Sequence, residues 1–379
     1  MFLPDAFQRA LAAAIGLAVL LPDAHALLRL NRGKDLIHLT ANGQLGWDSN
    51  LFSTANGQGD VLAVASVVAD YQRRAGAIGL DAAVGLEAGH FQEYDAEDYL
   101  NPRASVEFTK SSGRTTGSWA SSATRKSQGD VAASLRAESW DYDTTLNLRY
   151  PVIERYSITG SVGYARTDYL NSPVLVDLTT LQASSDLLYA IHSQRDLIAG
   201  YRYRVSDSAA DTVSRDNAFI VGLSGKILSK VTGTVRAGYQ ARHTKGLGTV
   251  ERNDGLTAAT SATWNINGRS SLTAQVTHDF ATTSTDVSTD SSAYTLDYKA
   301  AFNPRWSATA GAGLGFLKFL GQRGAGRSDT YATASLGVTW KRSDRLAVSL
   351  SYAHLSNWST LALADYARHT VSLGVSSRF

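Results

Sequence analysis

Segments in which apolar and polar residues alternate recur from residue 36 to the last residue, and this pattern constrains the fold more than any other feature of the chain. Val231, Val235 and Tyr239, for example, alternate with polar or small residues, as do Val348 and Leu350. A period of two residues places neighbouring side chains on opposite faces of a β-strand. The chain is therefore expected to form strands that are apolar on one face and polar on the other.

About eighteen such segments follow one another, with sixteen or twenty strands as alternatives because residues 128–139 could extend a neighbouring strand. Short connections alternate with longer polar ones along the whole chain, for example 226–230 and then 243–255. An up-and-down antiparallel barrel with short periplasmic turns and longer extracellular loops produces this rhythm, whereas a β-sandwich does not keep it. The sequence thus predicts an all-β transmembrane β-barrel, and an even strand count returns both termini to the periplasm. The predicted strands are 36–47, 61–71, 77–88, 103–110, 115–125, 142–150, 156–166, 184–192, 196–205, 216–224, 231–242, 256–265, 270–280, 292–302, 305–317, 328–340, 345–354 and 368–379.

Composition agrees with a barrel and excludes several other classes of protein. The chain has 44% hydrophobic and 18% charged residues, and it contains 32 Gly and 17 Tyr but only 6 Pro. Because Cys is absent, disulfide frameworks, thiolate metal sites and a lipoprotein anchor are excluded. The net charge of +2 gives no indication of nucleic-acid binding. No cofactor or metal is expected, and prolines such as Pro102 are expected in connections or at strand edges.

The first 26 residues have the composition of a signal peptide. Arg9 precedes an apolar run over residues 10–21, and Ala24 and Ala26, on either side of His25, provide small residues in the arrangement that signal peptidase cleaves. Export is therefore expected, with residues 1–26 as the signal peptide and residues 27–379 as the mature barrel. A short hydrophobic N-terminal helix of a soluble protein is the alternative.

Aromatic residues gather at the ends of the predicted strands. In a membrane barrel such positions form two girdles at the lipid–water interfaces, where amphipathic rings are favoured. Core aromatics of a soluble β-protein would not be sorted to strand ends. Girdle residues at the short turns are Tyr71, Tyr150, Tyr156, Trp264, Trp306 and Trp340, and those at the opposite ends are Trp47, Tyr164, Tyr294, Tyr331, Tyr352 and Trp358.

Charged residues on the polar faces are candidates for the lining of a pore. A barrel of about eighteen strands is too wide for side chains to fill, so its lumen is expected to hold water. Arginines on some strands and acids on others could set a transverse field that orients polar or anionic solutes, or they could form ion pairs that stiffen the wall. The candidates are Arg149, Arg202, Arg204, Arg236, Arg242, Asp279, Asp297 and Lys299.

The last strand carries a recognisable ending. Residues 369–379 alternate and stop on Phe379, which resembles the C-terminal signature of bacterial outer-membrane barrels. That resemblance implies recognition by the barrel-assembly machinery, with Phe379 as the assembly signal, and a location in the outer membrane of a Gram-negative cell. Partners in that setting would be outer-membrane lipid and lipopolysaccharide.

The start of the mature chain carries a second resemblance. The segment from Gly43 to Phe52, a strand that runs into Asp48-Ser49-Asn50-Leu51-Phe52, resembles the opening of β-barrel porins encoded in exopolysaccharide loci. The resemblance implies a channel associated with polysaccharide export that works with periplasmic export components. A general or solute-specific diffusion porin and a non-conducting structural or adhesin barrel are the alternatives.

An enzyme is not expected. The histidines are scattered along the chain, and no serine has the spacing of a nucleophile elbow. The residues do not decide between export and diffusion.

Overall fold

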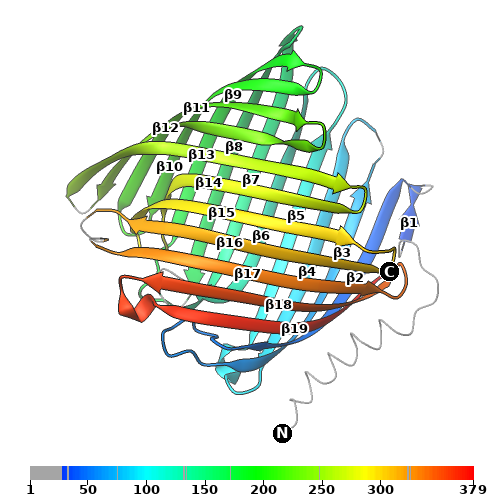
Figure 1. Cartoon of the computed structure of the whole chain (residues 1–379), viewed down its shortest axis with the longest axis vertical. Coiled ribbons are helices and arrows are strands. Elements are labelled where there is room, and N and C mark those ends of the chain that lie inside the picture. Colours follow the sequence, from blue (N-terminus) through cyan, green and yellow to red (C-terminus); the bar gives the residue numbers. More distant parts are fainter. Residues whose placement is uncertain are drawn as a thin grey trace.

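The chain folds as a closed antiparallel β-barrel (Figure 1). The computed structural model describes residues 28–31, 34–74, 76–130, 133, 135–170, 172–246, 248–321, 324 and 326–379. Eighteen strands, β2 to β19, follow one another around the wall, and β19 pairs with β2 to close it. The predicted signal peptide lies outside the described residues. In the part of the chain that the structure describes, no helix is long and apolar enough to cross a membrane.

The prediction of an eighteen-strand barrel is confirmed. Each predicted strand corresponds to one observed strand, and residues 128–139 extend two neighbours instead of forming another. The strands of the barrel are β2 (Asp35–Asp48), β3 (Asp60–Arg73), β4 (Gly79–Phe91), β5 (Tyr99–Lys110), β6 (Thr116–Asp130), β7 (Leu135–Ile153), β8 (Tyr156–Leu170), β9 (Leu178–His192), β10 (Arg195–Ser208), β11 (Thr212–Leu228), β12 (Val231–Gly246), β13 (Thr249–Asn267), β14 (Ser270–Thr282), β15 (Ser288–Ala301), β16 (Trp306–Phe319), β17 (Ser328–Lys341), β18 (Leu346–Ser359) and β19 (Tyr366–Arg378).

Several predicted long loops are mostly strand. β12 and β13 leave only residues 247–248 between them, where a loop over 243–255 was predicted, and residues 209–211 replace the predicted loop 206–215. Beyond the membrane both faces of a hairpin lie in a polar environment, so the alternation that marks a strand is lost while the backbone still needs hydrogen-bond partners. Pro102, predicted in a connection or at a strand edge, lies within β5 just beyond the end of the β5–β6 ladder, where β5 has no partner on its β6 side.

The two ends of the described chain meet at β2. The Phe379 amide donates to the Leu39 carbonyl, and the Leu39 amide donates to the Phe379 carbonyl, at 2.8 and 3.0 Å. The short strand β1 (Leu28–Leu30) pairs with Asp35–Ile37 of β2, directly beyond the point where β19 ends. Phe379 is 2% exposed. The C-terminal residue therefore completes the seam of the barrel.

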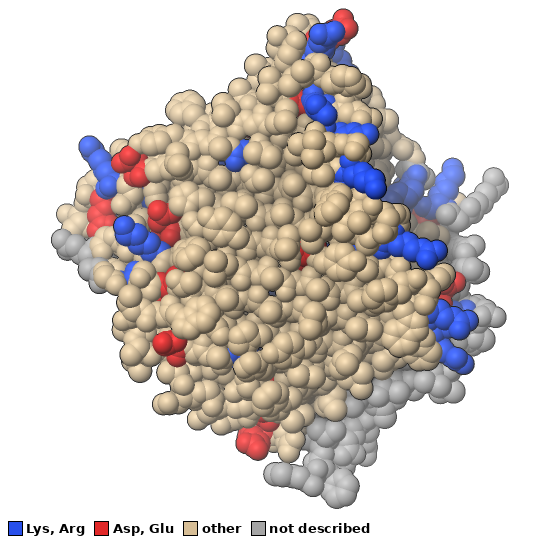
Figure 2. Space-filling model, in the orientation of Figure 1, with Lys and Arg blue, Asp and Glu red and all other residues tan. Residues whose placement is uncertain are grey.

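The outside of the barrel is a broad uncharged band between two charged rims. Figure 2 shows Lys and Arg along the end that carries the short turns, both signs of charge at the other end, and few charged residues between them. Leu256, Phe219 and Val221 are 70%, 69% and 66% exposed in this band. Such a surface suits the hydrocarbon core of a membrane.

Candidate functional site

The alternation of the strands places the predicted pore residues on the inner face. In β10, Leu197, Tyr201 and Tyr203 are exposed on the outside, so Arg202 and Arg204 point the other way. The pairing of neighbouring strands carries the same assignment around the barrel, because directly opposed residues share a face. Arg149, Arg236, Arg242, Asp279, Asp297 and Lys299 are all placed inside in this way. That solutes pass these side chains stays a prediction.

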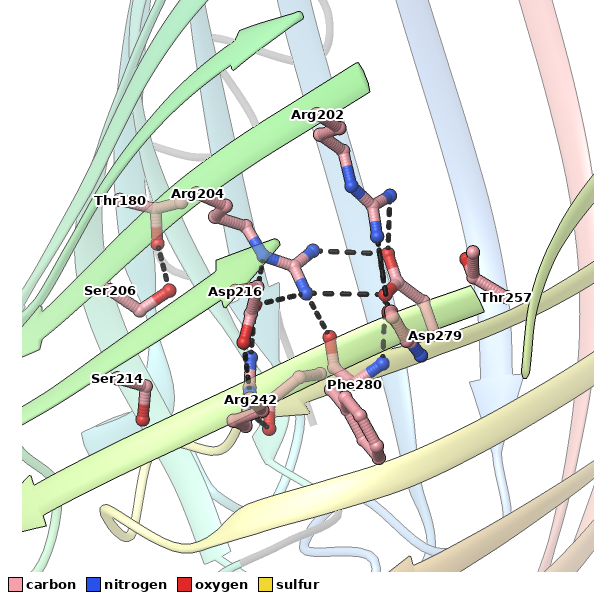
Figure 3. A network of polar contacts seen from close by, with 12 residues as sticks. Thr180, Arg202, Arg204, Ser206, Ser214, Asp216, Arg242, Thr257, Asp279 and Phe280 are labelled. Carbon is pink, nitrogen blue, oxygen red and sulfur yellow. Dashed lines mark hydrogen bonds and ion pairs between the residues drawn. The ribbon is translucent and has the colours of Figure 1, made fainter. Parts of the chain in front are cut away.

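Three of the arginines form one network with two aspartates (Figure 3). Arg202 donates two hydrogen bonds of 2.8 Å to Asp279, and Arg204 donates to the same carboxylate at 3.1 and 3.2 Å. Arg202 lies on β10 and Asp279 on β14, four strands away. The wall must therefore curve sharply here for the two side chains to meet.

Asp216 is the centre of this network. It lies directly opposite Arg204 of β10 and directly opposite Arg242 of β12. Arg242 donates to both of its carboxylate oxygens, at 2.7 and 2.8 Å, and Arg204 donates at 2.7 Å. The side chains of Arg242 and Asp216 are 0% and 1% exposed, so this pair is withdrawn from the lumen.

The network fills a place where the wall lacks a strand pairing. The β13–β14 ladder ends at Ala258 and His278, although β14 continues to Thr282. Beyond this point the Phe280 carbonyl accepts a hydrogen bond from Arg204 at 2.6 Å, and its amide donates to Asp279 at 2.9 Å. Side chains thus replace the missing strand partner, as buried backbone groups require. For Arg202, Arg204 and Arg242 the wall-stiffening alternative is the better description.

Two other predicted arginines lie in a more open part of the inner wall. Arg236 binds Asp186 at 2.7 Å with 31% of its side chain exposed, and Arg149 lies 3.5 Å from Asp196 with 51% exposed. Both line a recess of about 560 Å³. Its other polar side chains come from β5 to β9: Glu107, Thr109, Lys110, Ser118, Asn147, Thr159, Ser161, Ser184 and Asp186.

An acidic recess of about 340 Å³ adjoins the arginine recess and shares Glu107 with it. Asp70, Asp81 and Asp143 line it as well. Asp81 is directly opposite Glu107, an unfavourable pairing of like charges. Arg74, in the turn before β4, compensates by donating two hydrogen bonds of 2.7 Å to Asp81, and these bonds raise the pKa of the Arg74 guanidinium.

The wall from β16 to β19 is different, because the inward residues in the middle of these strands are small and uncharged. Ser335, Ser351 and Ser372 are typical, and Gly311 faces Ser335. Asp297 and Lys299 are inward on β15, beside this wall, and away from the arginine network. Among the described residues no group of three His, Cys, Asp or Glu could hold a metal ion.

The seven girdle residues Trp47, Tyr71, Tyr150, Tyr156, Trp264, Trp306 and Trp340 lie on the outer face at strand ends, and Trp306 stacks on Trp340 at 6.2 Å. Tyr331 was predicted to belong to the girdle, but it faces inward opposite Gly315. A Cβ added at Gly315 would lie 2.0 Å from the Tyr331 ring, so the ring fits only over a glycine.

Of the acids that complete these pairs, the sequence analysis named only Asp279. Asp216 could have been found, because the pairing of β10, β11 and β12 places it directly opposite Arg204 and Arg242. Asp186 and Asp196 could not, since each meets its arginine across three strands.

Residues 214–379, which run from β11 to the C-terminus, match the family described as "Putative beta-barrel porin 2". This part of the chain matches a β-barrel porin family. No curated protein sequence matches the chain. Among solved structures, OpdK of Pseudomonas aeruginosa with vanillate is 11% identical, with 90% of this chain and 98% of that chain covered and a TM-score of 0.50. OccK2 (OpdF) of the same organism, in complex with glucuronate, is 12% identical, with 91% and 98% covered and a TM-score of 0.50.

At this low identity, the similarity to the two solved structures is a similarity of fold. Together with the closed barrel and the porin family match, it indicates a porin-like barrel located in the outer membrane. Porins are channels and not enzymes.

Proposed function

We propose that the protein is an outer-membrane channel for acidic sugars, and that the recess of Arg149 and Arg236 is where such a solute binds. The recess carries this proposal. It has two partly exposed guanidinium groups on one side and hydroxyl and amide side chains around them. Guanidinium groups bind carboxylates, and hydroxyl and amide groups exchange hydrogen bonds with a polyol.

The neighbouring acidic recess supports the same function. Asp70 and Asp143 have no ion pair among the described residues; Asp70 lies on β3, on the far side of Glu107 from the arginines, and Asp143 lies on β7, the strand of Arg149. A field therefore crosses this part of the wall, and it orients a solute with its carboxylate towards Arg149 and Arg236. The arginines buried around Asp216 contribute little to this field, because they are neutralised by their partners.

The charge at the short-turn rim favours entry of anions from the periplasm. Exposed basic residues there, such as Arg269, Arg305 and Arg342, lie in the short turns after β13, β15 and β17. A ring of like charge raises the local concentration of oppositely charged solutes. Export of an acidic polysaccharide is the finer form of the proposal, and the resemblance of residues 43–52 to porins of exopolysaccharide loci supports it. Diffusion of small sugar acids through the same recess is the alternative.

Planar-bilayer recordings test the recess. We expect glucuronate to block the sodium chloride current of the wild type and Arg149→Ser or Arg236→Ser to weaken the block by about tenfold each, as expected for loss of a hydrogen bond to a charged group. Arg103→Ser is the matched control, because Arg103 is an inward arginine of β5 outside the recess. Equal block in all four proteins would contradict the assignment.

A second experiment tests the rim. One variant changes three basic residues of the short-turn rim to Glu together: Arg269, Arg305 and Arg342. The control variant changes three basic residues of the opposite rim to Glu, so that its net charge changes equally: Lys245, Arg252 and Lys318. We expect only the first variant to lower the permeability of anions applied from the periplasmic side. Equal loss in both variants would mean that net charge, and not the periplasmic rim, sets the preference.

A further inference from the structure

Basic residues lie side by side on the outer surface of β11, β12 and β13, which run together to the end opposite the short turns (Figure 1). Arg215 is directly opposite His243, and His243 is directly opposite Arg252. The alternation that places Tyr239 on the outside puts all three on the same face. Lys245, two residues beyond His243, is the diagonal neighbour of both arginines. These four exposed residues form the basic row.

The basic row has an excess of positive charge. Like charges in directly opposed positions destabilise a pair of strands unless acids compensate them. Among the residues that the structure describes, no member of the basic row is in an ion pair. Two acids lie on the same face, but Asp254 accepts a hydrogen bond from the Tyr239 hydroxyl, and Asp207 lies opposite Val213 at the edge of the row. The strands themselves therefore do not neutralise the row.

Other outward-facing basic residues at this end are matched with acids. Arg166 of β8 forms an ion pair of 2.6 Å with Asp168, and Lys318 of β16 lies directly opposite Asp290. The basic row differs from these, because its arginines face a histidine where an acid would compensate them. An anion from outside the chain can supply the missing negative charge.

The height of the basic row above the apolar band indicates which anion it meets. From Trp264, in the girdle at the short turns, to Leu256 there are nine residues of β13, enough for a tilted strand to cross the hydrocarbon layer. Leu256, Tyr239 and Phe219 are directly opposed and mark the outer edge of the band, and the row begins four residues beyond them. That is about 13 Å along a strand and about 9 Å along the membrane normal. A headgroup layer is about 5–8 Å thick, so these long side chains reach back into it.

We propose that the basic row is a binding site for the phosphate groups of lipopolysaccharide in the outer leaflet of the membrane. Guanidinium groups bind phosphate through two parallel hydrogen bonds. The exposed apolar residues directly below the row contact the acyl chains of the same molecule. A free phosphate ion would gain only the first of these two interactions, so the site favours the lipid. The site lies on the outer surface of the barrel and does not depend on what passes through the lumen.

Binding of fluorescently labelled diphosphoryl lipid A to the detergent-solubilised protein tests the site. The titration is made in EDTA, so that no divalent cation can bridge the lipid to an acid. We expect Arg215→Gln with Arg252→Gln to weaken binding by about thirtyfold, since each basic residue near an anionic lipid surface contributes about fivefold. The same two arginines changed to Lys keep the charge and should retain most of the affinity. Both positions are exposed, so the variants should fold, and the shift in gel mobility on heating verifies this.

A matched control and two other ligands show whether the basic row recognises the lipid phosphates. Arg269→Gln with Arg305→Gln removes the same charge from exposed positions at the short turns and should leave the affinity for lipid A unchanged. Lipid A without its phosphate groups should bind equally to the wild type and to the double Gln variant of the row. Inorganic phosphate, at the concentration at which lipid A saturates the protein, should displace little of the bound lipid.

The opposite results would each overturn the proposal. Equal affinity of the wild type and the double Gln variant would mean that the arginines do not contact the lipid. Equal loss in the variant at the short turns would mean that net charge, and not the basic row, attracts lipid A. Displacement by inorganic phosphate would make the row a site for a phosphate ion. If the wild type bound lipid A only when EDTA was omitted, divalent cations held by acids would explain the binding.

Discussion

Asp216→Asn should destabilise the barrel strongly, because it removes the carboxylate that two arginines share. Arg204 keeps Asp279 as a partner, but Arg242 has no second carboxylate among the residues the structure describes. The Arg242 side chain is 0% exposed, so its charge cannot be hydrated without opening the wall. Leaving one member of a buried pair uncompensated costs about 3–5 kcal/mol. We expect a loss of that size in the free energy of unfolding.

Urea unfolding of the barrel in lipid vesicles, followed by Trp fluorescence, measures this loss. Asp196→Asn is the matched control, because its partner Arg149 is half exposed and 3.5 Å away. That change should cost less than about 1 kcal/mol. In the double variant Asp216→Asn with Arg242→Met the uncompensated charge is gone, so part of the lost stability should return.

Two results would refute this reasoning. The first is a loss in Asp216→Asn no larger than that in Asp196→Asn, which would mean that water reaches the network. The second is a double variant that is less stable than Asp216→Asn by as much as Arg242→Met alone destabilises the wild type. That result would mean that Asp216 and Arg242 do not act as a unit.

Three further outcomes are expected. The purified protein should show a β-rich circular dichroism spectrum in detergent and migrate differently on gels before and after heating, since a closed barrel pairs all its backbone groups; a helical spectrum would contradict the fold. Deletion of Phe379 should reduce outer-membrane levels far more than deletion of the exposed loop residue Leu363, and equal levels would contradict its role at the seam. Replacing Arg202, Arg204 and Arg236 with Ser leaves Asp279 and Asp186 without these partners, so the reversal potential in a salt gradient should shift towards cation preference; an unchanged potential in a folded variant would reject the prediction that they line the pore.

The wall of the barrel could be predicted from the sequence because lipid and water impose opposite demands on alternate residues. In β12, for example, Val235 and Tyr239 had to face lipid, which fixed Arg236 and Arg242 inside. Where a strand extends beyond the lipid, apolar and polar residues no longer alternate. The outer halves of β12 and β13 were therefore predicted to be a loop. The period of two marks only the part of a strand that lies in the membrane.

Which residues pair with the inward charges depends on the curvature of the wall, and a local sequence pattern does not predict that curvature. Arg204 and Asp216 are direct neighbours and follow from strand pairing. The contact of Arg202 with Asp279 exists only because the wall bends between β10 and β14 and the β13–β14 ladder ends early. The same holds for the end of β6, where Gly129 meets Ser53 in the loop between β2 and β3.

The seam between β2 and β19 makes closure of the barrel depend on pairing between its first and last strands. Thr40 of β2 pairs with Arg378, so this ladder closes a loop that includes nearly the whole barrel. Contacts of such sequence separation form slowly, since the chain entropy is lost before any pairing energy is gained. Until Phe379 arrives at Leu39, one edge of the nascent sheet has no partner and can pair with another molecule. The time for which the edge of β2 stays open therefore sets the risk of aggregation.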